Sequence, residues 1–363
     1  MPSTFVDRAL AAYTAMRESM AIADGRGLYR LTADATSPVA YLWEFSRALF
    51  GTLCLAGIRG ELSSYTVAAR ERLRALDHYW TGSAYASAVF PPGGDLYHDD
   101  NAWVALAQLL AYRMGLSSDL SRVKRVWTFA KRGWDRSRSD PYPGGVFWVQ
   151  QGMGYGLSNH DRGAGATAGS AEIGFHLWEL TGSSFKEATM MVDWVAQYLD
   201  QSGSGGGPFL NVVRRDGTID TNVWSYNQGV VLGCRVLQYR LTGDLSFLRS
   251  AEAIARQTLS TFGTFENHPP SFNAMCFQNL LMLHAATSDR TLRSNVQQAM
   301  RTYADWAWNP ATGARDERTN LFHFDDAGHP ALATQPARVQ DQGAMTQLFA
   351  LLAWDPADYH HLT

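Results

Sequence analysis

The chain has 363 residues and a formal net charge of −3 at pH 7, with 31 Lys and Arg set against 34 Asp and Glu. This length can bury the core of one large domain or two ordinary ones, and the balanced charge gives no electrostatic reason to expect nucleic acid or an anionic membrane as a partner. Aromatic residues make up 12% of the chain and include 12 Trp, so we expect them to line a cleft as well as the core.

The N-terminal segment, residues 1–25, lacks the basic start and the sustained apolar run of an export signal. Its apolar residues recur instead on one face of a predicted amphipathic helix, at Phe5, Ala9, Ala12, Tyr13 and Met16. No stretch of the sequence approaches the ~18 consecutive apolar residues that a membrane-spanning helix needs. We therefore expect a cytoplasmic protein with no membrane partner, and a mature secreted form is the alternative.

The three cysteines, Cys54, Cys234 and Cys276, are odd in number, far apart and set among apolar residues. This pattern predicts buried free thiols, which fits a reducing compartment.

A short turn rich in Gly, Thr and Ser, followed by an amphipathic helix, recurs along the chain. The turns contain Gly57, Gly115, Gly182, Gly243 and Thr287. From Gly57 to Gly243 their spacing is roughly 60 residues, which suits a pair of helices with its loops, and such periods indicate stacked helical hairpins.

The two helices of each predicted hairpin differ in kind. The helix after the turn is amphipathic, as in residues 123–134, whereas the helix before it is apolar on nearly all sides, as in 103–112, 230–237 and 345–354. Helices that are apolar all round belong inside, so an inner ring of them wrapped by amphipathic helices predicts an (α/α)6 barrel. An open solenoid is the alternative, but the apolar last helix, 342–354, favours closure.

Two segments depart from this helical pattern. Residues 142–151 are predicted to form a short β-hairpin, and the Gly- and Ser-rich segment 201–208 has the composition of an interdomain linker. Because the hairpin repeat continues on both sides of 201–208, we interpret that segment as a mobile loop and expect one domain over residues 1–363.

Long loops that lead into the predicted inner helices should line one open face of the barrel. These loops are residues 85–98, 141–166, 203–222 and 262–273. Loops of such length in a compact domain usually carry function.

Two adjacent aspartates, Asp99 and Asp100, end the first of these loops and precede the uncharged stretch 103–112. One Asp is a common N-cap, but a second at the start of such an apolar helix needs a further reason. Neighbouring residues at a helix start permit a carboxyl separation near the ~5–5.5 Å of retaining glycosidases, rather than the ~6.5–9.5 Å of inverting ones. General-acid work would need one pKa raised, and a like charge next door together with burial raises it.

The sequence leaves a structural alternative for the Asp pair, and it also contains a candidate metal site and a candidate Ser/His/Asp site. A double N-cap or a solvated acidic turn is the structural alternative, and Asp325–Asp326, followed by Ala-Gly-His-Pro, is assigned to such a surface turn. His98 with the Asp pair and with His160–Asp161 or His323 has no spacing typical of a metal site, so none is expected. The segment 158–161 combines Ser, His and Asp but lacks a nucleophile elbow.

Three motifs together resemble glycoside hydrolase family 76, the endo-α-1,6-mannanases and their fungal cell-wall relatives. They are the double aspartate before a tryptophan in residues 97–103, the Gly-Gly-aromatic-Trp loop in 144–148 with Asn159 after it, and the Trp-x-Tyr-Asn-Gln-Gly helix opening in 224–229. The family's later Phe-Lys-Gly motif is not evident around 272–275.

The resemblance implies an (α/α)6 barrel, retention of anomeric configuration, no cofactor and no metal, with Asp99 as nucleophile and Asp100 as general acid/base. The substrate would be α-mannan or a manno-oligosaccharide, and the absence of an export signal suggests imported oligosaccharides. Residues expected to bind or stack on the sugar are Tyr97, Asn101, Trp103, Trp148, Asn159, Trp224, Tyr226 and Asn227.

Alternatives are another (α/α)6 sugar enzyme, such as an epimerase or an unsaturated uronyl hydrolase, and a mannan transglycosylase that uses the same two aspartates. A carbohydrate-binding protein without catalysis is the alternative from a different class.

Overall fold

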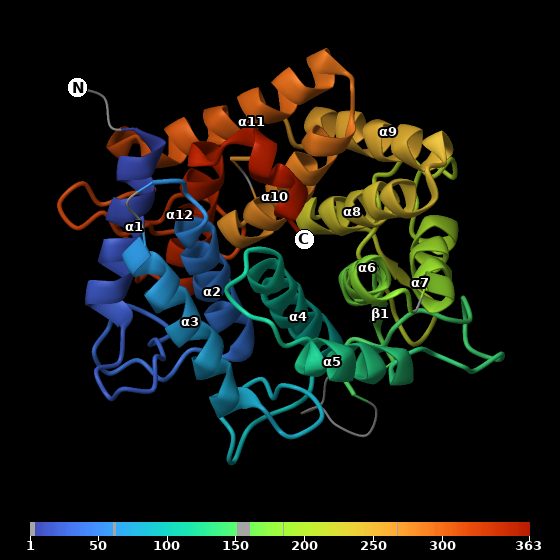
Figure 1. Ribbon diagram of the computed structural model, residues 1–363, viewed down its shortest axis with the longest axis horizontal. Helices are drawn as coiled ribbons and strands as arrows, with labels where there is room; N and C mark the ends of the chain where they lie inside the picture. Colours follow the sequence, from blue (N-terminus) through green and yellow to red (C-terminus); the bar gives the residue numbers. More distant parts are fainter. Residues whose placement is uncertain (1–3, 61–62, 151–159, 184, 267) are drawn as a thin grey trace.

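The structure is a computed structural model that describes residues 4–60, 63–150, 160–183, 185–266 and 268–363. In this part of the chain, helices alternate between an outer and an inner ring (Figure 1). The outer helices are α1 (Phe5–Met20), α3 (Ser63–Ala75), α5 (Ser121–Arg132), α7 (Phe185–Tyr198), α9 (Leu245–Phe262) and α11 (Arg290–Trp308). The inner helices are α2 (Leu42–Ala56), α4 (His98–Arg113), α6 (Ala164–Thr181), α8 (Ser225–Thr242), α10 (Pro270–Ala286) and α12 (Val339–Ala353). Three 3₁₀ turns lie among the described residues, η1 (Leu76–Tyr79), η2 (Pro310–Thr312) and η3 (Pro356–His361).

The inner ring is closed. Each inner helix packs against the next one along the chain, and α12 packs against α2. The predicted (α/α)6 barrel is therefore confirmed, and the open solenoid is wrong.

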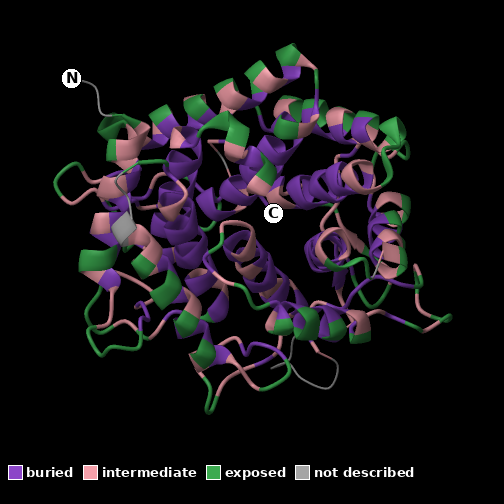
Figure 2. Cartoon of the chain, in the orientation of Figure 1, coloured by how far each residue is buried: buried purple, intermediate pink, exposed green. Residues whose placement is uncertain are grey.

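Burial follows the two predicted kinds of helix. The inner helices are buried on nearly all sides, whereas the outer helices bury one face and expose the other (Figure 2). On α5 the buried face is Val123, Val126, Trp127, Phe129 and Ala130. On α1 the buried side chains include the predicted Ala9, Ala12, Tyr13 and Met16.

The seam that closes the ring depends on two glycines. A Cβ atom on Gly51 of α2 would lie 2.5 Å from the carbonyl oxygen of Gly343 on α12, and one on Gly343 would lie 2.5 Å from the Ala48 nitrogen. Real Cβ atoms do not approach backbone that closely, so the missing side chains let the first and last inner helices touch.

Several helix ends follow from local sequence. Gly182 and Gly243 end α6 and α8 in the left-handed region, with φ of 76° and 73°, which glycine adopts without strain. The next outer helices begin at capping residues such as Asp244, which accepts from the Ser246 N–H, and Asp289, which accepts from the Leu292 N–H. The repeated turns thus end each of these inner helices and start the outer helix that follows.

A small antiparallel sheet of β1 (Arg162–Gly163), β2 (Val212–Val213) and β3 (Ile219–Asp220) was not predicted. The prediction of a local hairpin over 142–151 is wrong for its described residues. Val146 pairs with Trp134, Phe147 with Arg162, and Val149 with Tyr97, so the segment bridges three distant parts of the chain.

The remaining structural expectations concern isolated residues. Cys54, Cys234 and Cys276 are buried and free, as predicted. Asp325 and Asp326 lie in an exposed turn, also as predicted. Among the described residues, no helix is long and apolar enough to cross a membrane.

Candidate active site

The aspartate pair lies in the first turn of α4. Tyr97 is the N-cap and makes no side-chain capping bond, so the helix begins at His98 and neither aspartate is a cap. The Asp99 carboxylate accepts two hydrogen bonds, from the Asp100 backbone N–H (2.9 Å) and from the Trp148 indole N–H (3.0 Å). Within the described part of the chain, no hydrogen bond reaches the Asp100 carboxylate.

The start of α4 is held by the segment that follows Gly145. The His98 N–H donates to the Trp148 carbonyl (2.8 Å), and the Gln150 N–H donates to the Leu96 carbonyl (2.9 Å). This backbone pairing brings the Trp148 indole to Asp99, although the two residues are 49 positions apart.

Asn101 was predicted to bind sugar, and its surroundings correct that prediction. Its side chain is 0% exposed. Its amide oxygen accepts from the Tyr85 N–H (2.7 Å), and its amide nitrogen donates to the carbonyls of Tyr85 (2.9 Å) and Tyr97 (2.8 Å). The side chain therefore fastens the preceding loop to α4 and offers no polar atom to a sugar.

Two hollows meet at Asp99, Trp148 and Tyr226. The first, the aromatic hollow, has a volume of about 290 Å³ and also contains Asp100. Aromatic side chains of several helices complete its wall, namely Trp43, Tyr97, Trp103 and Phe272. Such a wall is suited to the apolar faces of sugar rings.

The second hollow, the polar hollow, has a volume of about 320 Å³. It is lined by Asp161, Asn211, Arg214 and Asp220, which come from β1 to β3 and their loops. Arg214 forms ion pairs with Asp220 (3.5 Å) and Asp161 (3.9 Å). The sequence predicted that the loops 141–166 and 203–222 line the open face. Asp161 was considered only for a metal site or a Ser/His/Asp site, and Asn211, Arg214 and Asp220 were not singled out.

Electrostatics separates the two aspartates. Burial raises the pKa of Asp99, while the hydrogen bonds from Asp100 and Trp148 oppose that rise by stabilising the charged form. Burial raises the pKa of Asp100 well above its usual range, and the negative charges of Asp99 and Glu44 add to the effect. Arg47 opposes this rise. Asp99 thus favours the ionised form and Asp100 the protonated form.

Glu44 and Arg47, both on α2, were missed by sequence reasoning. A signal was present, because Arg47 interrupts a helix whose other residues from Phe45 to Leu55 are uncharged. A charge in an all-round apolar helix is placed inside the protein and needs a reason.

The other predicted residues divide into those at the hollows and those behind them. Tyr97, Trp103, Trp148 and Tyr226 all line the aromatic hollow. Trp224 lines neither hollow, and its ring packs edge-on against Phe272 at 5.5 Å between centroids. Trp224 is half-buried and supports the wall through Phe272, and its predicted contact with sugar stays a prediction.

Asn227 is buried behind the wall. Its amide nitrogen donates to the Asn211 side-chain oxygen (3.2 Å), and it is Asn211 that lines the polar hollow. The predicted direct contact of Asn227 with sugar is therefore corrected, because its side chain reaches the polar hollow only through Asn211. Asn159 lies outside the described residues.

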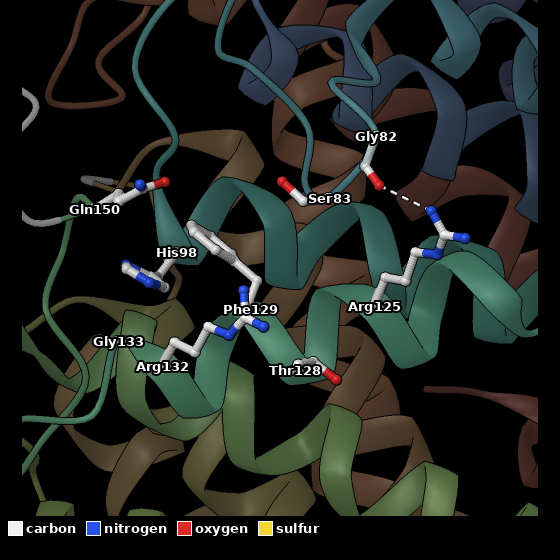
Figure 3. A pocket seen from close by; sticks show the side chains of 9 residues that line it. All are labelled: Gly82, Ser83, His98, Arg125, Thr128, Phe129, Arg132, Gly133 and Gln150. Atoms are coloured by element: carbon white, nitrogen blue, oxygen red, sulfur yellow. Dashed lines mark hydrogen bonds between the residues drawn. The ribbon is translucent and has the colours of Figure 1, made fainter.

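A third hollow, of about 370 Å³, borders α4 and α5 and contains neither aspartate. Figure 3 shows His98 and Phe129 at one end of it and Arg125 at the other, where Arg125 donates to the Gly82 carbonyl. The His98 ring stacks on Phe129 at 4.2 Å, and burial lowers the pKa of His98 to about 4. His98 is thus a neutral packing residue beside the acids.

Among the described residues, no group of three or more His, Cys, Asp or Glu side chains is arranged to hold a metal ion.

Comparison with known families decides the identity of the barrel. The pattern of glycosyl hydrolase family 76 matches residues 8–351, which include both aspartates and every inner helix except the end of α12. The chain belongs to glycosyl hydrolase family 76. The resemblance drawn from the three motifs is confirmed, and the protein is a glycoside hydrolase by family.

Solved structures, among them family 76 proteins, share the fold at low sequence identity. A mannosidase of the family, Bt3792 from Bacteroides thetaiotaomicron, superposes with a TM-score of 0.80 at 20% identity, over 96% of this chain and 98% of that chain. A second structure is an inactive variant of the α-1,6-mannanase GH76A of Salegentibacter sp., in which two adjacent aspartates are replaced by asparagine, in complex with α-1,6-mannotriose. It superposes with a TM-score of 0.76 at 17% identity, over 96% of this chain and 99% of that chain. Dfg5 from Chaetomium thermophilum, in complex with glucosamine, has a TM-score of 0.73 at 15% identity, over 96% and 90%. No curated protein matched the sequence.

Proposed function

We propose that this family 76 protein hydrolyses α-1,6-mannosidic linkages in α-mannan or manno-oligosaccharides, with retention of configuration. The observation that carries the proposal is the unequal aspartate pair at the aromatic hollow. Asp99 receives two N–H donors, whereas the Asp100 carboxylate is half-buried beside like charges without a donor among the described residues. A retaining glycosidase needs one ionised and one protonated carboxyl group flanking the linkage.

The first step forms a glycosyl–enzyme. Asp100 gives its proton to the glycosidic oxygen, while an Asp99 oxygen attacks C1 and the bond from C1 to the leaving oxygen breaks through an oxocarbenium-like transition state. The indole N–H of Trp148 holds the Asp99 carboxylate in place and keeps it ionised.

The second step releases the sugar. The Asp100 carboxylate, now without its proton, takes one from a water molecule, whose oxygen attacks C1 and displaces Asp99. The product keeps the α configuration after two inversions, and both carboxyl groups return to their starting states.

The solved relatives support the choice of substrate. The α-1,6-mannanase of Salegentibacter is described as inactive when two adjacent aspartates are replaced, and it binds α-1,6-mannotriose in that form. This chain also carries an adjacent aspartate pair, and the aromatic walls on one side and polar groups on the other suit a mannose chain.

The test uses α-1,6-mannobiose to mannohexaose as substrates and compares wild type with Asp99→Asn and Asp100→Asn. Each variant should lose about 10²–10⁴-fold in kcat/KM, the usual contribution of such a group. Proton NMR of the first product formed should show the α anomer. Asp326→Asn, in the exposed second aspartate pair, is the matched control and should keep full activity.

A good leaving group separates the two roles. An aryl α-mannoside that departs without protonation should restore the first step in Asp100→Ala but not in Asp99→Ala, because only the nucleophile is then required. The proposal would be rejected if both Asn variants kept their activity, or if the first product were the β anomer.

A further inference from the structure

An arginine inside the inner ring has no anion bonded to it among the described residues. Arg47 of α2 is 0% exposed, and its only hydrogen bond in the described chain runs from Nε to the Ser46 hydroxyl (3.2 Å). Both terminal nitrogens, Nη1 and Nη2, are buried without a partner there. The guanidinium lies against two aromatic faces instead, 4.8 Å from the ring centroid of Trp43 and 4.7 Å from that of Phe50.

A carboxylate lies one helical turn earlier on the same helix. Glu44 is in the first turn of α2, and its Oε2 atom is buried without a hydrogen-bond partner among the described residues. The helix α2 packs against α4, which carries the aspartate pair. Trp43, beside Glu44 in the sequence, lines the aromatic hollow together with Asp100. The two unpaired charges therefore stand on the helix that faces the pair.

Buried charges without partners are rare because removal of an ion from water is unfavourable by several kcal/mol. An apolar side chain at position 47 would fill the same space without that penalty. The presence of Arg47 is therefore better explained by the electrostatic effect of its charge on a neighbouring group than by a contribution to stability. The neighbour on which both Arg47 and Glu44 act is Asp100.

We propose that Arg47 and Glu44 are opposed positioning residues that set the pH range over which Asp100 is protonated, Arg47 by attraction to its carboxylate and Glu44 by repulsion. The inference rests on the proposed function, in which Asp100 is the general acid/base. Neither residue transfers a proton itself, and each acts through its charge.

Other charged groups around these residues are few. On α4 itself, Asp99 adds negative charge, and Tyr97 has its pKa raised to about 12 by burial and by the carboxylates near it. From α12, Arg338 faces Glu44 and is also paired with Asp341 (2.9 Å). On α6, Glu172 is buried and lines the same small cavity as Arg47, together with Thr363, and burial raises its pKa well above the usual range. Arg47 is thus the cation that faces Asp100 itself.

The experiment measures the pH profile of kcat/KM on α-1,6-mannotriose, whose alkaline limb reports the protonated acid in the free enzyme. Removal of the cation in Arg47→Met makes the Asp100 carboxylate less favourable, so its pKa rises and the alkaline limb moves to higher pH by about one unit. Removal of the anion in Glu44→Gln has the opposite sign and moves the limb to lower pH, by about half a unit or more.

Two controls separate charge from packing. Arg47→Gln removes the charge but keeps a polar side chain, so it should move the limb in the same direction as Arg47→Met if the charge, rather than the packing, is responsible. Glu18→Gln removes an exposed carboxylate of the outer helix α1 and should leave the limb unmoved. Met matches the length of Arg and removes a buried charge, so the Tm of Arg47→Met is expected to equal or exceed that of the wild type.

Opposite displacements by Arg47→Met and Glu44→Gln support the inference. An unmoved limb in either variant, or displacements of the same sign, overturns it. If Arg47→Met does not fold, Glu44→Gln decides alone. An inactive wild type on all mannosides would instead reject the proposed function, so the two failures are distinguishable.

Discussion

Asp99 and Asp100 are the same kind of residue at neighbouring positions in one helical turn, and their different chemistry comes from what surrounds each carboxyl group. Two N–H donors reach Asp99, one from the backbone and one from Trp148. Burial and the negative charges of Asp99 and Glu44 raise the pKa of Asp100, and only the Arg47 guanidinium lowers it. Hydrogen bonds to the charged form lower a carboxyl pKa, whereas burial and like charge raise it, so the environment assigns the two roles.

At this scale we predict the effect of Trp148→Phe. The variant keeps an aromatic wall but removes the N–H donor to Asp99, so the pKa of Asp99 rises. Because the nucleophile must be ionised, activity is lost below its pKa, and the acidic limb of kcat/KM should move to higher pH by about 0.5–1 unit. Trp306→Phe, on the outer helix α11, is the matched control. An acidic limb that stays in place in Trp148→Phe would show that the indole does not tune Asp99.

At the scale of the element, α4 is an inner helix whose start is fixed by side-chain and backbone contacts from outside the helix. Asn101 fastens residues 85 and 97, and residues 148–150 pair with residues 96–98. The site is thus built on a rigid helix terminus with a bridging segment laid across it. Such support keeps catalytic groups in position.

Asn101→Ala tests whether that residue is structural. The change leaves the buried N–H and C=O of Tyr85 without their partner, so the free energy of unfolding should fall on the order of 3 kcal/mol. Thermal or denaturant unfolding measures this loss, and kcat should fall with it because the aspartate turn is loosened. A residue that only bound sugar would raise KM on substitution and leave Tm unchanged, and that result would favour a sugar contact for Asn101 after all.

At the scale of the whole molecule, the barrel depends on contact between the first and last inner helices. Gly51 and Gly343 permit that contact by the absence of a side chain. The expectation that residues 1–363 form one domain stays a prediction, and a single cooperative unfolding transition would support it.

Gly343→Ala should weaken the seam. The new Cβ would lie 2.5 Å from backbone atoms of Arg47 and Ala48, so α2 and α12 must separate, at a loss of about 1–3 kcal/mol in the free energy of unfolding. Gly206→Ala is the control, because the nearest atom to its Cβ would be the Ser204 hydroxyl at 3.7 Å. Equal Tm values for the two variants would contradict a close-packed seam.

Much of the fold could be predicted because it depends on the pattern within each segment. Alternation of all-round apolar and amphipathic helices, with glycine turns between them, indicated a closed double ring, and the structure confirms it. The aspartate pair could be found because its two members are adjacent, and Tyr97 and Trp103 lie within one turn of them. These features are local, and local features are visible in a single sequence.

What tertiary structure alone decided depends on contacts between segments far apart in the chain. The hairpin predicted at 142–151 instead pairs with three other segments, since each of its short stretches finds a better partner elsewhere. Asn101 and Asn227 have residue types suited to sugar, but whether such a side chain faces a hollow or fills the space behind it is set by neighbouring helices. Glu44 and Arg47 belong to a helix distant in sequence from Asp100, and a charge acts through space rather than along the chain. The sequence by itself determined the barrel and the acids, and the packing of the ring decided how those acids are held and charged.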